Sequence, residues 1–159
     1  LHPENYPNDV PKSIVLPDLL NVLGKEWRLY DQNVMGEWYT FLILNQAYEE
    51  GYQLSERTAL EAAEGWGGDS YAVYLNENSD DVVFIMESSW DSPGDSEEFA
   101  QAFEDYADLR WGDSKVELEG SPTWQGENNS IVFFRAGDHT IWLMGPNENI
   151  IKTIISEYK

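Results

Sequence analysis

The feature that most constrains the fold is a glycine-dense segment near the middle of the chain, residues 62–74. A helix rich in small residues is predicted to end at Gly65, because glycine adopts the left-handed conformation that closes many helices. Gly67 and Gly68 follow, and the residues after them alternate aromatic and aliphatic side chains, as a strand does. Glycines so closely spaced fix the backbone path between two buried elements. We therefore interpret this segment as structural, a bend that locks a helical layer onto a sheet.

Hydrophobic periodicity predicts the remaining elements. Helices are expected at residues 36–50, 56–64, 92–109 and from 147 onward, with a short helical turn at 18–23. Strands are expected at 26–31, 70–76, 82–89, 131–135 and 139–144, and residues 115–119 are a candidate for one more. Ser55, Ser92 and Asn147 are expected to cap helices, since their side chains accept hydrogen bonds from first-turn N–H groups.

The order of these elements indicates the fold class. Strands come in runs and do not alternate with helices, which disfavours a doubly wound parallel sheet. We expect an α+β fold, with a mostly antiparallel sheet of about five strands and helices packed on one face. An extended, proline-rich lead-in (residues 1–17) and two helices precede the sheet, and residues 18–159 form a single domain. In the helix at 56–64, Ala59, Leu60 and Ala63 are expected on the inner face.

The charge balance limits the partners. The chain carries 30 acidic and 9 basic residues, a net charge of −21. Such a surface repels phosphates and anionic lipids, so nucleic-acid binding and membrane attachment through a basic face are excluded. Solubility is the main interpretation of the charge; calcium capture, attraction of cationic partners and a halophilic origin are the alternatives. No apolar run reaches the roughly 18 residues of a membrane span, so no membrane insertion is expected.

The residue content also limits the chemistry. The absence of cysteine excludes disulfides, thiolate catalysis and cysteine-bound metal centres. Of the two histidines, His2 lies in the lead-in and His139 follows a hairpin turn, where Ser130 and Asp138 are sequence neighbours rather than a triad. No metalloprotease or nucleophile-elbow motif occurs, and the glycine segment precedes a strand, whereas a phosphate loop precedes a helix. We expect no catalytic residues, no metal centre and no cofactor.

The first residues, 1–7, lack the basic and apolar regions of a signal peptide, and the chain has no initiator methionine. We therefore expect a mature or excised fragment of a longer product.

Tryptophans beside acidic residues are the best ligand-binding candidates: Trp66 with Asp69, and Trp90 with Asp91. Acidic and aromatic residues together are typical of sugar sites, and paired carboxylates cleave glycosidic bonds. The structural alternative is that Asp69 hydrogen-bonds the glycine bend and Asp91 helps to open the following helix. An enzyme that uses a carboxylate pair is the least favoured hypothesis.

Two further features concern partners. The acidic loops at Asp80-Asp81 and at residues 91–98 could bind Ca²⁺ weakly, although neither has the twelve-residue calcium-loop pattern. Solvated carboxylates are the simpler interpretation. Trp111 and Trp124 stand in polar surroundings, so we expect them to form the partner-facing patch.

Several segments, taken in order, resemble a known group of proteins. They are residues 1–6, 15–19, 36–37, 62–71 and 90–92. The chain resembles the C-terminal half of uncharacterised bacterial secreted proteins or lipoproteins that carry a zincin-like, metallopeptidase-type region upstream. Ser70 departs from this pattern, since relatives often carry a basic residue there. The resemblance implies an extracellular or cell-envelope setting and an accessory role, and no active-site residue of the group has a matching position here.

These observations favour a non-catalytic accessory or interaction module. It would pack on, or serve, a peptidase-like domain upstream in the same polypeptide, or a separate protein partner. The alternative is a stand-alone sugar- or peptide-binding domain that uses Trp66, Asp69, Trp90 and Asp91.

Overall fold

The computed structural model describes residues 10–47, 51–112 and 115–158. Its helices are α1 (Leu20–Leu23), α2 (Glu37–Asn45), α3 (Glu56–Ala63), α4 (Pro93–Trp111) and α5 (Glu148–Ile155), followed by the 3-10 turn η2 (Ser156–Tyr158). Its strands are β1 (Trp27–Asn33), β2 (Trp66–Asn76), β3 (Val82–Trp90), β4 (Val116–Leu118), β5 (Ser121–Gln125), β6 (Ser130–Ala136) and β7 (His139–Gly145). As expected, Ser55, Ser92 and Asn147 cap α3, α4 and α5 through their side chains.

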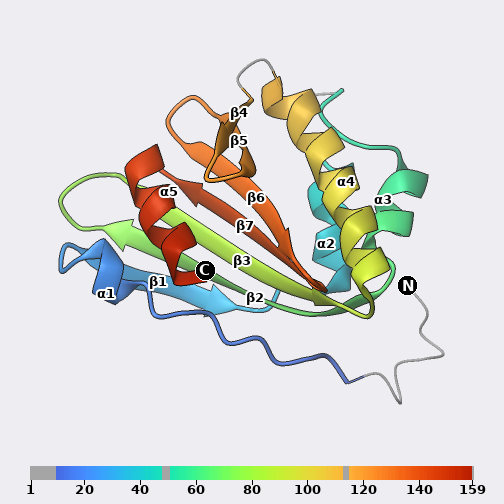
Figure 1. Ribbon diagram of the computed structural model, residues 1–159, viewed down its shortest axis with the longest axis horizontal. Coiled ribbons are helices and arrows are strands. Elements are labelled where there is room, and N and C mark those ends of the chain that lie inside the picture. The colour runs from blue at the N-terminus through green and yellow to red at the C-terminus, as the bar shows by residue number, and fades with distance from the viewer. Residues whose placement is uncertain (1–9, 48–50, 113–114, 159) are drawn as a thin grey trace.

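The strands form one seven-stranded sheet in the order β1-β2-β3-β7-β6-β5-β4. All neighbouring pairs are antiparallel. The chain builds β1 to β3, passes through α4 to the far edge of the sheet, and returns strand by strand until β7 lies beside β3 (Figure 1). The middle of the sheet therefore joins two halves that are far apart in the sequence.

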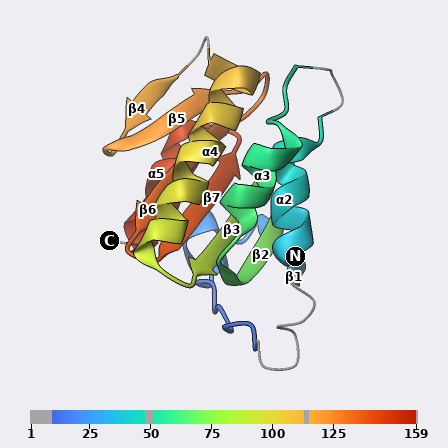
Figure 2. The same ribbon diagram turned by 90° about the vertical axis from the view of Figure 1, so that its right-hand side faces the viewer.

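The expected sheet of about five strands with helices on one face is wrong. α1 and α5 pack on one face of the sheet, whereas α2, α3 and α4 pack on the other, where Figure 2 shows them side by side. The central strands are apolar on both faces. In β7, Ile141 and Leu143 belong to the core beneath α1 and α5, whereas Trp142 and Met144 pack against the core beneath α2, α3 and α4. Strands buried on both faces appear in the sequence as continuous apolar runs, and such runs need helices on both sides.

The additional strand is β5, which the sequence pattern missed. It contains Pro122, which is partly buried, and proline cannot donate a hydrogen bond to a sheet ladder. The strand tolerates proline because its neighbour β4 has only three residues and pairs with it over three positions. Gly120 and Pro122 close together resemble a turn when only the sequence is read.

Two helices also differ from expectation. α2 ends at Asn45, because the backbone at Gln46 is extended, and it does not continue to residue 50 as predicted. In α3 the buried residues are Ala59, Ala62 and Ala63, whereas Leu60 is 39% exposed. The inner face of α3 is therefore made of alanines only, which leaves room beside it.

The glycine-dense segment lies partly inside a strand, because β2 begins at Trp66 and not near residue 70 as expected. The backbone of Lys12 crosses Gly68, where a Cβ atom would collide with the Lys12 carbonyl group. The Lys12 N–H donates a hydrogen bond of 2.6 Å to the Gly67 carbonyl. Of the predicted lead-in, residues 1–9 lie outside the described residues; the remainder has no regular structure and buries Leu16 in the core.

Candidate functional site

Asp69 is a buried anchor of the fold, with 2% of its surface exposed. Its Oδ1 accepts a hydrogen bond of 2.7 Å from the Met35 N–H, and its Oδ2 accepts one of 2.7 Å from the Gly36 N–H. The indole Nε1 of Trp66 donates a third bond of 3.0 Å to Oδ2. A single carboxylate thus ties the beginning of β2 to the N-terminus of α2, where a negative charge is stabilised by the helix dipole.

Trp90 and Asp91 also have structural contacts. The Trp90 ring is fully buried, lies 4.5 Å from the ring of Phe99, and donates from Nε1 to the Thr140 hydroxyl at 3.0 Å. The Asp91 side chain is exposed, and its backbone N–H donates to the Gly65 carbonyl at 2.8 Å. Trp66 and Asp69 therefore lie at the same end of β2 and β3 as Trp90 and Asp91. The Trp90 ring, however, is not accessible to a ligand. Ligand binding by these four residues stays a prediction.

The expected partner-facing patch is wrong for Trp124. Its side chain is fully buried, and Nε1 donates to Asp108 Oδ1 at 2.7 Å. Trp111 is half-buried, with the Arg110 guanidinium 5.0 Å from its ring centre. Trp111 is the last residue of α4, and both tryptophans belong to or pack against the core beneath that helix.

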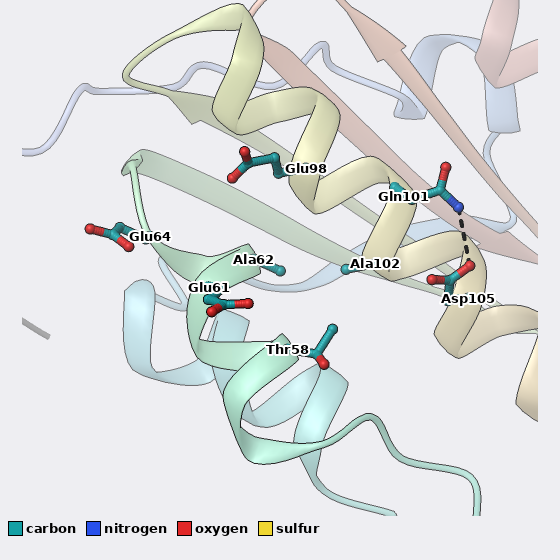
Figure 3. Close-up of a pocket in the computed structure, with 8 residues that line it drawn as sticks. All are labelled: Thr58, Glu61, Ala62, Glu64, Glu98, Gln101, Ala102 and Asp105. Carbon is teal, nitrogen blue, oxygen red and sulfur yellow. Dashed lines mark hydrogen bonds between the residues drawn. The ribbon is translucent and has the colours of Figure 1, made fainter.

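A groove of about 500 Å³ lies between α3 and α4 (Figure 3). Its lining residues are Thr58, Glu61, Ala62, Glu64, Glu98, Gln101, Ala102 and Asp105. The lining positions on α4 repeat at intervals of three and four, so they lie along one side of the helix. The groove exists because alanines, rather than large side chains, face each other between the helices.

The charges of this groove have one sign. Each charged residue among its described lining residues is a carboxylate: Glu61, Glu64, Glu98 and Asp105. Glu61 pairs with Arg57 on the outer side of α3, at 2.8 Å. Asp105 accepts a hydrogen bond of 3.1 Å from the Gln101 amide. The walls are therefore acidic and partly held in place, while the floor is apolar.

A second polar cluster surrounds His139, where β3 ends and β7 begins. The His139 Nδ1 lies 2.7 Å from Glu87 Oε1. Ser89 stands opposite His139 in the strand ladder, but it is only 1% exposed and its hydroxyl accepts a hydrogen bond of 3.2 Å from Lys12 Nζ. A nucleophile must be reachable by its substrate, so this arrangement orients a histidine without presenting an accessible serine.

The hydroxyl of Tyr158 is buried close to the Glu87 carboxylate. Burial, and then the charge of the Glu87 carboxylate, raise the pKa of Tyr158 well above its usual value. Burial likewise raises the pKa of Tyr74, which lies in the same core. These phenols therefore remain neutral at physiological pH and contribute packing rather than charge.

For metals, the described part of the chain contains no group of three or more His, Asp or Glu side chains placed to hold an ion. In the loop between β2 and β3, Asp81 accepts a hydrogen bond of 2.8 Å from the Ser79 hydroxyl. Most of the second predicted loop, residues 91–98, is helical because α4 begins at Pro93; in its first turn, Asp95 accepts a hydrogen bond of 2.8 Å from Ser92. Weak Ca²⁺ binding at these loops stays a prediction.

Four exposed apolar or aromatic residues lie along the segment that runs from β1 into the first turn of α2. We call Tyr30, Val34, Trp38 and Tyr39 the β1–α2 surface; they are 63%, 56%, 49% and 56% exposed, respectively. Trp38 rests against the buried Phe41, with ring centres 5.1 Å apart, and therefore has a supported orientation. Within the described residues, none of the helices has the length and apolar character of a membrane span.

Sequence reasoning missed both the groove and the β1–α2 surface. The signal for the groove is the spacing of Glu98, Gln101 and Asp105, at intervals of three and four along α4. Trp38 and Phe41 have the spacing of residues on one side of a helix, which gives no sign that Trp38 is 49% exposed. Only the packing of α3 beside α4 shows which polar positions face another element.

Comparison with known proteins gives one match. The model of a family described as a domain of unknown function, DUF8575, matches residues 27–154. No curated protein and no solved structure matches the chain.

Proposed function

This chain belongs to the DUF8575 family, whose description gives no activity, and we propose that it is a non-catalytic interaction module. It packs against a peptidase-like domain located upstream in the same polypeptide; a separate protein partner is the second form of the proposal. The setting is extracellular or at the cell envelope, as the resemblance to secreted proteins implies.

The observation that carries the proposal is the β1–α2 surface. Single exposed apolar residues are common on soluble proteins, but this segment exposes three aromatic residues, Tyr30, Trp38 and Tyr39, within ten positions, and aromatic residues are enriched at protein interfaces. Tryptophan and tyrosine contribute large contact areas at low entropic cost, and they dominate binding energies at such centres. Arg28, with its guanidinium 5.5 Å from the Tyr30 ring, adds a further residue type that is enriched at interfaces.

The position of the surface supports an upstream partner. Lys12 is joined to Gly67, and Asp69 holds the N-terminus of α2. Gly67 and Asp69 are two positions apart along β2, which is about 7 Å. Lys12 thus meets the sheet close to the first turn of α2, which carries Trp38 and Tyr39.

A catalytic role receives less support. The Glu87–His139 pair is the arrangement closest to an acid–base site, and the serine beside it is buried under Lys12. The sugar-binding alternative would need open rings, and Trp90 is fully buried. Binding of a peptide is better served by the surfaces described above than by Trp66 and Trp90.

Hydrogen exchange tests the proposal. Amides of residues 29–39 are compared between the 159-residue chain and the complete gene product. We expect slower exchange of this segment in the complete product, because the upstream domain covers it. The double variant Trp38→Ser/Tyr39→Ser is expected to abolish the difference, whereas the control Leu109→Ser/Val116→Ser, with residues of similar exposure elsewhere, leaves it intact. Equal exchange in both products would reject the intramolecular form.

A further inference from the structure

We propose that the glycine bend carries a binding site for a lysine side chain, that the chain fills this site with its own Lys12, and that a lysine-bearing extended segment of a partner protein displaces it. The site lies where β2 begins, β3 ends and β6 turns into β7, and we call the following residues the lysine cradle: Gly67, Gly68, Ser89, Trp90 and Asp138. Residues 10–13 thus form a strap that keeps the cradle closed. The inference goes beyond the docking of an upstream domain, because no residue of the cradle belongs to the β1–α2 surface.

The first argument is that acceptors from β3 and from the β6–β7 turn converge on the Lys12 ammonium. Its Nζ donates to the Trp90 carbonyl at 2.5 Å and to the Ser89 hydroxyl at 3.2 Å. The Asp138 carboxylate lies 3.8 Å from the same nitrogen. Ser89 is only 1% exposed and Trp90 is fully buried, so the fold itself fixes two of these acceptors. A primary ammonium has three donors, and the cradle offers it a carbonyl, a hydroxyl and a carboxylate.

The second argument is that the bend accepts the backbone on either side of the lysine. The Lys12 N–H donates to the Gly67 carbonyl at 2.6 Å, and a Cβ atom on Gly68 would collide with the Lys12 carbonyl group. A Cβ atom on Gly67 would lie 3.3 Å from the Lys12 Nζ. Glycine at both positions therefore leaves the space that an extended segment and its lysine side chain need. These contacts use only backbone atoms and an ammonium, so they serve any extended segment that carries lysine at this position.

The third argument is that the strap is held mainly at Lys12. Residues 10–13 are all exposed, and the Lys12 side chain itself is 45% exposed. Within the described residues, the bond from Lys12 to Gly67 is the single backbone hydrogen bond that joins residues 10–13 to the sheet. Further along the chain, Leu16 is buried in the core and stays anchored when the strap leaves. A segment with so few contacts opens at a low free-energy cost, so a competitor replaces it without unfolding the domain.

The fourth argument is the charge around the cradle. Asp138 Oδ2 faces Lys12, and Asp138 Oδ1 lies 3.9 Å from His139 Nε2. The Asp91 side chain adjoins Gly67, since a Cβ atom there would lie 3.2 Å from Asp91 Oδ1. These carboxylates and the net charge of −21 attract a basic segment and repel an acidic one. A metal ion is a poorer match, because the described part of the chain contains no group of three His, Asp or Glu side chains placed to hold one.

Fluorescence anisotropy tests the competition, with a fluorescein-labelled peptide that carries the sequence of residues 10–13 between flanking glycines. We expect Lys12→Ala to bind this peptide at least about tenfold more tightly than the unaltered 159-residue chain, because the apparent affinity of a site falls with the fraction of molecules in which it is open. A peptide with norleucine in place of lysine keeps the aliphatic stem and loses the ammonium, and we expect it to bind Lys12→Ala about tenfold more weakly.

Two glycine variants locate the peptide. Lys12→Ala/Gly68→Ala fills the space in which the strap carbonyl lies, so we expect it to lose binding. Lys12→Ala/Gly94→Ala is the matched control, because Gly94 is exposed in the first turn of α4 and a Cβ atom there would lie 3.4 Å from the Ser92 hydroxyl, an ordinary contact. Its affinity should stay within about twofold of that of Lys12→Ala.

A measurement on the unaltered chain does not depend on whether these variants fold. With excess peptide, the amide hydrogen of Lys12 should exchange faster with solvent, because the displaced strap loses its hydrogen bond to Gly67. Unchanged exchange would mean that the peptide does not displace the strap, and the proposal would fail.

Three further results would overturn the proposal. Equal binding by the unaltered chain and by Lys12→Ala would mean that the strap does not compete. Equal binding of the norleucine peptide, or binding retained by Lys12→Ala/Gly68→Ala, would place the peptide outside the cradle. Binding of free lysine with the affinity of the peptide would mean a site for amines and not for a protein segment. None of these outcomes bears on hydrogen exchange of residues 29–39, which tests the β1–α2 surface.

Discussion

Replacement of Asp69 by asparagine tests the anchoring role of this carboxylate. Both of its oxygens accept hydrogen bonds, from Met35 and Gly36 at 2.7 Å each and from Trp66 at 3.0 Å. An asparagine amide has one oxygen, so one donor among these groups would face another donor. The best orientation keeps the oxygen toward Gly36 and Trp66, and the Met35 N–H then loses its acceptor.

The expected cost follows from these contacts. A hydrogen bond to a charged group contributes about 1.5–3 kcal/mol, and a neutral one contributes about 1 kcal/mol. Loss of one charged bond and weakening of two others lowers the free energy of unfolding by about 3 kcal/mol. With a urea m-value of about 2 kcal/mol/M, the midpoint of unfolding falls by about 1.5 M.

Urea unfolding followed by tryptophan fluorescence measures this change. Asp80→Asn is the matched control, because it removes the same charge from an exposed loop residue, and its effect is expected within about 0.5 kcal/mol. If Asp69→Asn unfolds at the same urea concentration as this control, the carboxylate does not anchor α2 and the reasoning is refuted.

Two further predictions concern solution conditions. Burial raises the pKa of Tyr158 and Tyr74 above the value of about 10 found in unfolded chains, so the unfolded state releases these protons first and stability should fall as the pH rises above about 10. The urea midpoint measured from about pH 9 to pH 11 checks this fall, which Tyr158→Phe should make less steep; an equally steep fall in the variant would contradict the assignment. Because the net charge is −21, the melting temperature should rise as NaCl increases from about 0.1 to 1 M, where the screening length shortens from about 10 to 3 Å; a melting temperature that decreases over this range would contradict it.

Local signals in the sequence correctly predicted where three helices begin. Ser92 accepts a hydrogen bond of 3.2 Å from the Asp95 N–H at the beginning of α4, and Asn147 accepts one of 3.1 Å from the Ile150 N–H at the beginning of α5. These contacts involve residues three apart, so the side chain and its partner are both visible in a short stretch of sequence.

Features that depend on distant partners were predicted poorly. Neighbouring apolar residues in one strand, such as Phe84 and Ile85 or Trp142 and Leu143, face opposite cores. Helices could be assigned to both faces of the sheet only if this was recognised. An alternating pattern indicates a sheet with helices on one face. A continuous apolar run, the pattern of a strand covered on both faces, cannot be told from a buried helix by periodicity alone. β5 was missed for a related reason, since Pro122 is tolerated only because of the short strand that pairs with it.

The candidate site shows the same limit. The structural alternative expected Asp69 to hydrogen-bond the glycine bend. Only the Trp66 side chain of that bend donates to it, and its backbone donors, Met35 and Gly36, lie more than 30 residues earlier in the chain. The acidic groove depends on how closely α3 approaches α4, which no spacing within either helix reveals.

The pairing of β3 with β7 has a consequence for how the protein folds during its synthesis on the ribosome. Residues 84–89 pair with residues 139–144, so the middle of the sheet cannot form until this later segment has been synthesised. Until then, a nascent chain presents the apolar edge of β3 with nothing beside it, which is a surface that promotes aggregation. Pairing between segments so far apart in the sequence makes folding slow, so a chaperone that shields this edge would raise the yield of native protein.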